Sequence, residues 1–86
     1  MSETASKQIS IHISEEQTIT ELSKLVQHFK AEIYLKKIVN GNVIEVNLKS
    51  FLGLITLQLK NNDRITVRTI GSDYNEALSK VVEFLT

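Results

Sequence analysis

The sequence predicts a two-layer α+β fold with the element order β-α-β-β-α-β-α. Several short segments alternate apolar and polar residues, which is typical of half-buried strands. Between them lie segments whose apolar residues recur at helical spacing. A central Asn-Gly dipeptide favours a tight turn that joins two of the strands into a hairpin. Because each helix has one apolar stripe and the strands are half polar, we expect all helices to cover one face of a single sheet.

Length and composition narrow the class of protein. The 86 residues suffice for one domain, and a hydrophobic fraction of 42% suffices for a core. Ten basic and ten acidic residues cancel, which argues against a nucleic-acid-binding surface. The lack of cysteine excludes disulfides and thiolate metal sites. No apolar run is long enough to span a membrane and no leader is recognisable, so we expect a cytoplasmic protein without cofactor or metal.

The chain is expected to begin with a flexible tail. Residues 1–7 are rich in Ser, Thr, Glu and Lys and have no apolar period, so the folded domain is assigned to residues 8–86. Residues 8–14 alternate, with the apolar side formed by Ile9, Ile11 and Ile13. This alternation predicts the first strand.

A helix is predicted over residues 19–29. Its apolar stripe consists of Ile19, Leu22, Leu25, Val26 and Phe29. Thr18 and Glu21 have the spacing of a capping box, in which each side chain bonds a free amide at the helix start.

The clearest local signal is a hairpin over residues 31–48. Asn40-Gly41 is the preferred dipeptide of a two-residue type I′ turn. Folding the chain there pairs Leu35 with Val46, Ile33 with Leu48, Lys36 with Glu45 and Ile38 with Val43. The first two pairs share the core face, and the third is an attractive pair on the other face. The last pair lies near the tip, where we expect it to be exposed.

Residues 47–59 contain many large apolar side chains, and no single helix or strand can bury all of them. Ser50 is a good N-cap for a short helix that ends near Leu57. The residues expected to face the core from this helix are Leu54, Ile55 and Leu57. Phe51 and Leu52, in the first turn, are expected on its outer side, where two large apolar residues need something to cover them.

The remainder predicts a turn, a strand and a helix. Residues 60–63 form the turn, and residues 64–70 alternate as the fourth strand. Asp73 and Glu76 have the spacing of a second capping box. The inner stripe of the last helix is Tyr74, Ala77, Leu78, Val81 and Leu85.

One segment resembles a known family. Asn-Leu-Lys-Ser at residues 47–50, then two bulky apolar residues, Gly53, two more apolar residues and Thr56-Leu57, is similar to the regulatory-serine segment of HPr. HPr is the small phosphocarrier of the bacterial sugar phosphotransferase system. The resemblance extends over residues 9–85 and is strongest over residues 31–78. It implies an HPr-like open-faced two-layer sandwich, with a four-stranded antiparallel sheet and three helices on one face.

The resemblance also implies a modification site and a docking surface. Ser50 matches the family's regulatory serine, which is reversibly phosphorylated; the alternative is that it serves only as an N-cap. Phe51 and Leu52 match the bulky pair with which HPr proteins dock their partners, and the alternative is that they belong to the core. The remaining positions matched to partner binding are Gly53, Ile55, Thr20 and Lys24.

The chain departs from HPr at the site that carries phosphate. The family motif Gly-x-His-x-Arg-Pro begins the first helix, whereas residues 13–18 here read Ile-Ser-Glu-Glu-Gln-Thr. Without gaps, Glu15 stands in place of the histidine and Gln17 in place of the arginine; with a shorter loop, no residue corresponds. His12 and His28 are expected on the outer face of the first strand and near the end of the first helix. Glu15 either complements the helix dipole or imitates a phosphorylated histidine.

Three functions remain open at this point. The leading one is a non-enzymatic regulatory module that binds proteins, similar to the catabolite-repression homologues of HPr. Its partners would be HPr serine kinase, phosphotransferase components or a transcriptional regulator, with no nucleic acid and no membrane. The second is a phosphocarrier with a non-standard acceptor. The third is an adaptor that works through the tip of the hairpin, residues 38–43, which is longer than in the family. Either a monomer or a weak homodimer is expected.

Overall fold

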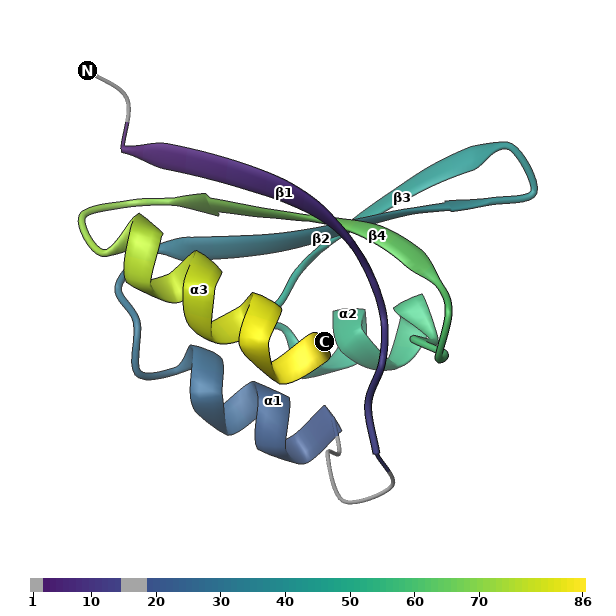
Figure 1. Cartoon of the computed structure of the whole chain (residues 1–86), viewed down its shortest axis with the longest axis horizontal. Coiled ribbons are helices and arrows are strands. Elements are labelled where there is room, and N and C mark those ends of the chain that lie inside the picture. Colours follow the sequence, from purple (N-terminus) through teal and green to yellow (C-terminus); the bar gives the residue numbers. More distant parts are fainter. Residues whose placement is uncertain (1–2, 15–18) are drawn as a thin grey trace.

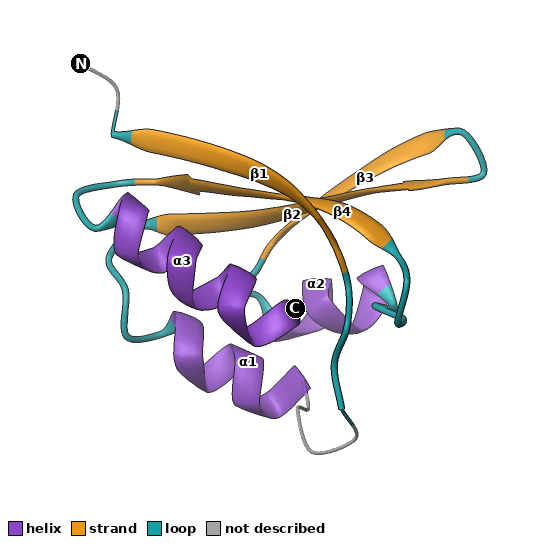
Figure 2. Ribbon diagram, viewed as in Figure 1, coloured by secondary structure: helices purple, strands orange, loops and turns teal. Residues whose placement is uncertain are grey.

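Seven elements follow one another in the predicted order (Figure 2). The computed structural model describes residues 3–14 and 19–86. Its elements are β1 (Thr4–Ser10), α1 (Ile19–Val26), β2 (Glu32–Val39), β3 (Asn42–Asn47), α2 (Phe51–Leu57), β4 (Arg64–Ile70) and α3 (Tyr74–Leu85).

The four strands form one antiparallel sheet in the order β1-β4-β2-β3 (Figure 1). All three helices lie against one face of this sheet, and the other face is open. The expected two-layer α+β architecture is therefore confirmed. The core lies between the layers because the strands turn one apolar face towards the apolar stripes of the helices. Its fully buried side chains include Ile33, Leu35, Ile65, Val67, Leu22, Val26, Ala77, Val81 and Leu85.

The hairpin has the register that the Asn-Gly turn predicts. Asn40 and Gly41 both have positive φ, as a type I′ turn requires. Leu35 pairs with Val46, and the N–H of Leu48 donates to the carbonyl of Ile33 at 2.7 Å. Lys36 pairs with Glu45, but the carboxylate of Glu45 binds Arg68 on β4 at 3.1 Å. Ile38 and Val43 pair at the tip, with 68% and 61% of their surfaces exposed.

The first strand lies earlier in the chain than predicted. Thr4–Ser10 pairs along the whole of β4, so the assignment of residues 1–7 to a tail preceding the domain is wrong for Thr4–Lys7. Residues 11–14 leave the sheet, and Ile11 exchanges backbone bonds with the turn at residues 62–63. Ile11 is nevertheless fully buried. The burial of Ile9 and Ile11 was therefore predicted correctly. The bounds of the strand were not, because they depend on which residues pair with β4.

Helix α1 ends three residues earlier than expected, at Val26. The N–H groups of His28 and Phe29 donate to the carbonyls of Leu25 and Val26, which tightens the last turn. Phe29 still packs into the core. The predicted capping box cannot be assessed because Thr18 lies outside the described residues.

The start of α3 is built differently from the predicted capping box. The side chain of Asp73 makes no hydrogen bond within its own helix. Its two carboxylate oxygens instead accept the N–H groups of Lys30 and Ala31, at 2.9 and 2.7 Å. These bonds join α3 to the loop between α1 and β2. Because they stabilise the charged form, chiefly through the N–H of Lys30, the pKa of Asp73 lies below its ordinary value.

This carboxylate should make folding stability depend on pH. A carboxyl whose pKa is lower in the folded than in the unfolded state contributes stability above the unfolded value, about 3.9 for Asp. That contribution disappears as pH falls through the folded pKa. We expect Asp73→Asn to unfold at lower urea concentration at neutral pH and to lose less stability between pH 7 and acid. Glu83→Gln, which changes an exposed carboxylate on α3, is the matched control. If the free energy of unfolding depended on pH identically in the wild type and Asp73→Asn, the stabilising role of the Asp73 carboxylate would be refuted.

A second prediction concerns Gly71, between β4 and α3. Gly71 has φ +142°, and a Cβ there would lie 2.7 Å from the Cα of Ala31. Gly41 has φ +81° with open space around its missing Cβ. We expect Gly71→Ala to destabilise the fold by more than about 3 kcal/mol, because it adds a backbone clash. Gly41→Ala should cost about 1–2 kcal/mol through conformation alone. Urea unfolding measures both, and equal costs would contradict the close packing at Gly71.

Candidate docking and modification site

Ser50 caps α2, as the sequence predicts. Its backbone is extended, at φ −92° and ψ 111°, and its Oγ accepts the N–H of Gly53 at 3.2 Å. The residue is exposed. The hydroxyl thus caps the N-terminus of α2 while the residue remains accessible to solvent. A modifying enzyme requires such access.

The outer side of α2 carries three exposed apolar side chains, here called the α2 patch: Phe51, Leu52 and Ile55. The exposed fractions are 46%, 76% and 48%, while Leu54 and Leu57 are buried. The expectation that Phe51 and Leu52 lie outside the core is confirmed. The expectation that Ile55 faces the core is wrong, because it lies one helical turn after Phe51 and shares its side. Apolar exposure of this kind marks a surface that another molecule can cover.

Gly53 allows α2 to lie close to the end of β3. The glycine is half-buried, and a Cβ there would lie 3.1 Å from the Cβ of Val46. The geometry gives Gly53 a packing role beneath the patch, in addition to the N–H that it donates to Ser50.

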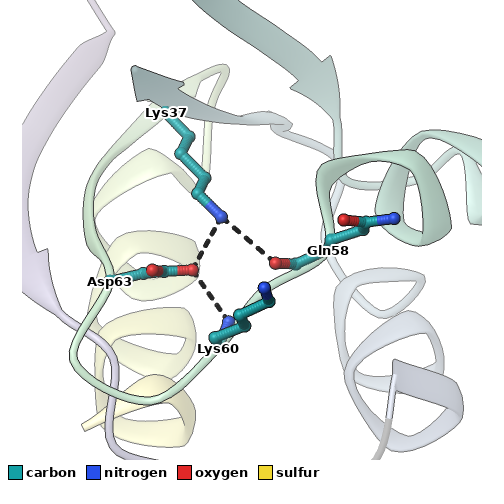
Figure 3. A network of polar contacts seen from close by, with 4 residues as sticks. All are labelled: Lys37, Gln58, Lys60 and Asp63. Carbon is teal, nitrogen blue, oxygen red and sulfur yellow. Dashed lines mark hydrogen bonds and ion pairs between the residues drawn. The ribbon is translucent and has the colours of Figure 1, made fainter. Parts of the chain in front are cut away.

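The C-terminal end of α2 is held by a network around Lys37 (Figure 3). The Nζ of Lys37 donates to the carbonyl of Gln58 at 3.1 Å and to the carboxylate of Asp63 at 2.7 Å. Asp63 also accepts the N–H of Lys60 at 2.9 Å. Gln58 adopts a left-handed conformation, with φ 51°, which ends the helix. The hydrogen bond from Lys37 is the chief reason that the pKa of Asp63 lies below its ordinary value.

Lys49 links the cap of α2 to α1. Its Nζ donates to the carbonyl of Phe29, just beyond α1, at 2.6 Å. Its backbone N–H donates to the side chain of Asn47 at 2.9 Å. Sequence reasoning missed the contacts of Lys37 and Lys49 because each joins residues about twenty positions apart. No local spacing rule signals such a contact.

Thr20 and Lys24 lie on the solvent side of α1. Both are exposed, and α1 contacts α2. Within residues 3–14 and 19–86, no hydrogen bond or ion pair joins either residue to α2. The structure therefore leaves both side chains available beside α2, without a direct bond to the α2 patch.

The two histidines lie apart from the α2 patch in sequence and are both exposed. His12 follows the end of β1 instead of lying on it as predicted, and its Nδ1 is 3.2 Å from the carbonyl of Ser10. Glu15 and Gln17, the residues aligned with the phosphocarrier motif, lie outside the described part of the chain. Among the residues that are described, no cluster of His, Cys, Asp or Glu is suited to hold a metal. No helix there has the length and apolarity to cross a membrane.

Comparison with known proteins identifies the family. The family model described as the HPr component phosphorylation site of the phosphotransferase system matches residues 15–86. The phosphocarrier protein HPr of Mycoplasma pneumoniae is 40% identical over 53 residues, which is 62% of this chain and 57% of that protein. The HPr-like protein Crh of Halalkalibacterium halodurans is 35% identical over 57 residues, which is 66% of this chain and 63% of that protein. The matches span less than two thirds of either relative.

Solved structures show the same fold. An HPr from Bacillus anthracis superposes with a TM-score of 0.82 at 24% identity, covering 96% of this chain and 98% of that one. Crh from Bacillus subtilis superposes with a TM-score of 0.67 at 24% identity, covering 88% and 82%. Because the family model matches most of its length, the chain belongs to the HPr family of the phosphotransferase system, a family of phosphocarriers and not of enzymes.

Proposed function

We propose that this chain is a regulatory member of its family, which docks other proteins through the α2 patch under the control of Ser50 phosphorylation. One observation carries the proposal: three large apolar side chains stand exposed on a short helix directly after an exposed, N-capping serine. Apolar anchors that lose their water on contact supply much of the binding energy of protein interfaces.

The absence of a histidine from residues 13–18 supports a regulatory role over phosphate transfer. In the HPr motif the phosphate is carried by a neutral imidazole at the start of the first helix, and an arginine stabilises the phosphate charge. Neither residue type occurs in this segment. The second candidate is a phosphocarrier with another acceptor. It is favoured by the similarity to the HPr of Mycoplasma pneumoniae, which is named a phosphocarrier protein.

Phosphorylation of Ser50 would place charge at the margin of the α2 patch. A phosphoserine carries a charge of about −1.5 to −2 at neutral pH. Free backbone N–H groups at a helix start can donate hydrogen bonds to the phosphate oxygens, so the fold need not open to admit the phosphate. The added charge would select partners with a basic residue beside an apolar pocket and repel purely apolar ones.

The proposed partners are therefore proteins. HPr serine kinase, other phosphotransferase components and a transcriptional regulator of carbon catabolite repression are the classes that fit the family. Thr20 and Lys24 are proposed as flanking contacts because they are exposed on the neighbouring helix. These partners imply a cytoplasmic location.

The first test is the mass of the intact protein after two separate incubations. One contains ATP and HPr serine kinase, and the other contains phosphoenolpyruvate and the general phosphotransferase enzyme. We expect ATP to add one phosphate that is absent from Ser50→Ala and retained in Ser79→Ala, an exposed serine on α3. Loss of the cap should cost Ser50→Ala only about 1 kcal/mol of stability, so the variant should stay folded.

A phosphate acquired from phosphoenolpyruvate would contradict the regulatory assignment and support the phosphocarrier candidate. If neither incubation adds mass, control through Ser50 is refuted.

A second test separates docking from folding. Leu52→Ala removes an exposed side chain and should change the free energy of unfolding by less than about 0.5 kcal/mol. We expect it to lower kcat/KM of phosphorylation by the kinase at least about tenfold, if the α2 patch contacts the enzyme. Leu54→Ala, from the buried side of the same helix, should instead cost about 2–5 kcal/mol of stability. An unchanged kcat/KM for both Leu52→Ala and Phe51→Ala would exclude the patch as the kinase-docking surface.

A further inference from the structure

We propose that the free edge of β3 pairs with β3 of a second copy of this chain, and that the two-fold axis of the resulting dimer passes through Val43. The sheet of one copy would then continue into the sheet of the other. This inference does not rest on the proposed function, because it concerns the opposite end of the hairpin from α2.

The two edges of the sheet are protected unequally. Strands β1 and β3 are the edges. On β1, Lys7 pairs with the buried Val67 and so lies on the helix-covered face, where an inward-pointing charge discourages further pairing. On β3, Asn42–Asn47 contains no lysine and no proline. Its one charge, Glu45, is engaged by Arg68 of its own sheet.

The turn determines which backbone groups of β3 are free. In a hairpin with a two-residue loop, the flanking pair, here Val39 and Asn42, exchanges hydrogen bonds. Along antiparallel strands, such hydrogen-bonded pairs alternate with pairs whose N–H and C=O groups point away from each other. Val43 and Glu45 therefore turn their N–H and C=O groups away from β2, towards the free edge. Within the described part of the chain, no turn, loop or cap uses these groups.

Several registers pair these free groups, and the side chains then favour one of them. An axis at Ile44 would also pair only free groups, those of Val43 with those of Glu45, but it would oppose each exposed Val43 to the charged Glu45 of the other copy instead of to an apolar side chain. An axis at Glu45 would place two like charges directly opposite each other, which is destabilising. An axis at Val43 opposes Val43 to its own copy, so that their free N–H and C=O groups pair, and it places Glu45 opposite the turn residue Gly41, so that no like charges meet.

The same register covers the exposed apolar residues of the tip. Ile38 and Val43 are neighbours on the open face, with 68% and 61% of their surfaces exposed. With the axis at Val43, the four side chains from two copies form one row across the shared sheet. The tip also projects beyond the helices (Figure 1), and a formal net charge of zero means that the copies do not repel at long range.

Sedimentation velocity on the full chain tests the association. We expect the apparent mass to rise above that of a monomer between about 10 µM and about 1 mM, because a single short strand pairing gives a weak interface. Val43→Lys, which opposes two lysines at the axis, should raise the dissociation constant at least about tenfold. Leu52→Lys, in the α2 patch, is the matched control and should leave it unchanged. A wild type that stays monomeric throughout, or a dimer abolished by Leu52→Lys alone, would overturn the proposal.

Single cysteines test the register, because the natural chain contains none. At the axis, a hydrogen-bonded antiparallel pair has Cα atoms about 5.5 Å apart, within the range that a disulfide can bridge. We expect Val43→Cys to form a disulfide-linked dimer on mild oxidation. Glu45→Cys lies on the same edge, but its two copies would be more than about 10 Å apart, so it should not cross-link. Cross-linking of Glu45→Cys with none for Val43→Cys would refute the register.

Discussion

The turn at Asn40-Gly41 is the constraint on which the rest of this structure depends. Side chains alternate between the faces of a strand, so a slip of one residue would move every apolar residue of the hairpin to the wrong face. The turn prevents that slip and holds Leu35 and Leu48 in the core. The chain leaves β3 directly after this hairpin, so the same register also fixes where Ser50 begins α2. This one dipeptide thus determines which face of the hairpin enters the core, where helix α2 begins and which backbone groups of β3 stay free.

Helix α2 shows how a very short helix can present a surface. A helix of seven residues is too short to be stable by itself. Here Ser50 satisfies an amide at one end, the ammonium of Lys37 binds the carbonyl of Gln58 at the other, and Leu54 anchors the middle. With both ends and one side held, the exposed side has a fixed geometry. Binding of a partner would therefore cost little conformational entropy in α2, because its exposed side is already ordered.

Local sequence signals predicted most of the fold, and long-range contacts account for what they missed. The hairpin register, the bounds of β4 and the cap of α2 each depend on residues within one element or turn. The placement of β1 does not: residues 4–7, which contain no large apolar side chain, form a strand because β4 offers them an edge, despite their lack of alternation. Asp73 has the spacing of a cap, yet the amides of Lys30 and Ala31 compete for its carboxylate. For the site, exposure of the first turn of α2 was predictable, whereas the network that fixes the helix was not.

The strand order has a consequence for the way this chain acquires its structure. Strand β4 lies between β1 and β2 in the sheet, but it is the last of the four strands in the sequence. During synthesis the β2–β3 hairpin can form as soon as it emerges, because its contacts are local. Strand β1 must wait for residues 64–70 before it has a neighbour. Closure of the sheet across this long loop should therefore be the slow event in folding, and the unpaired early strand is the segment most exposed to misassembly meanwhile.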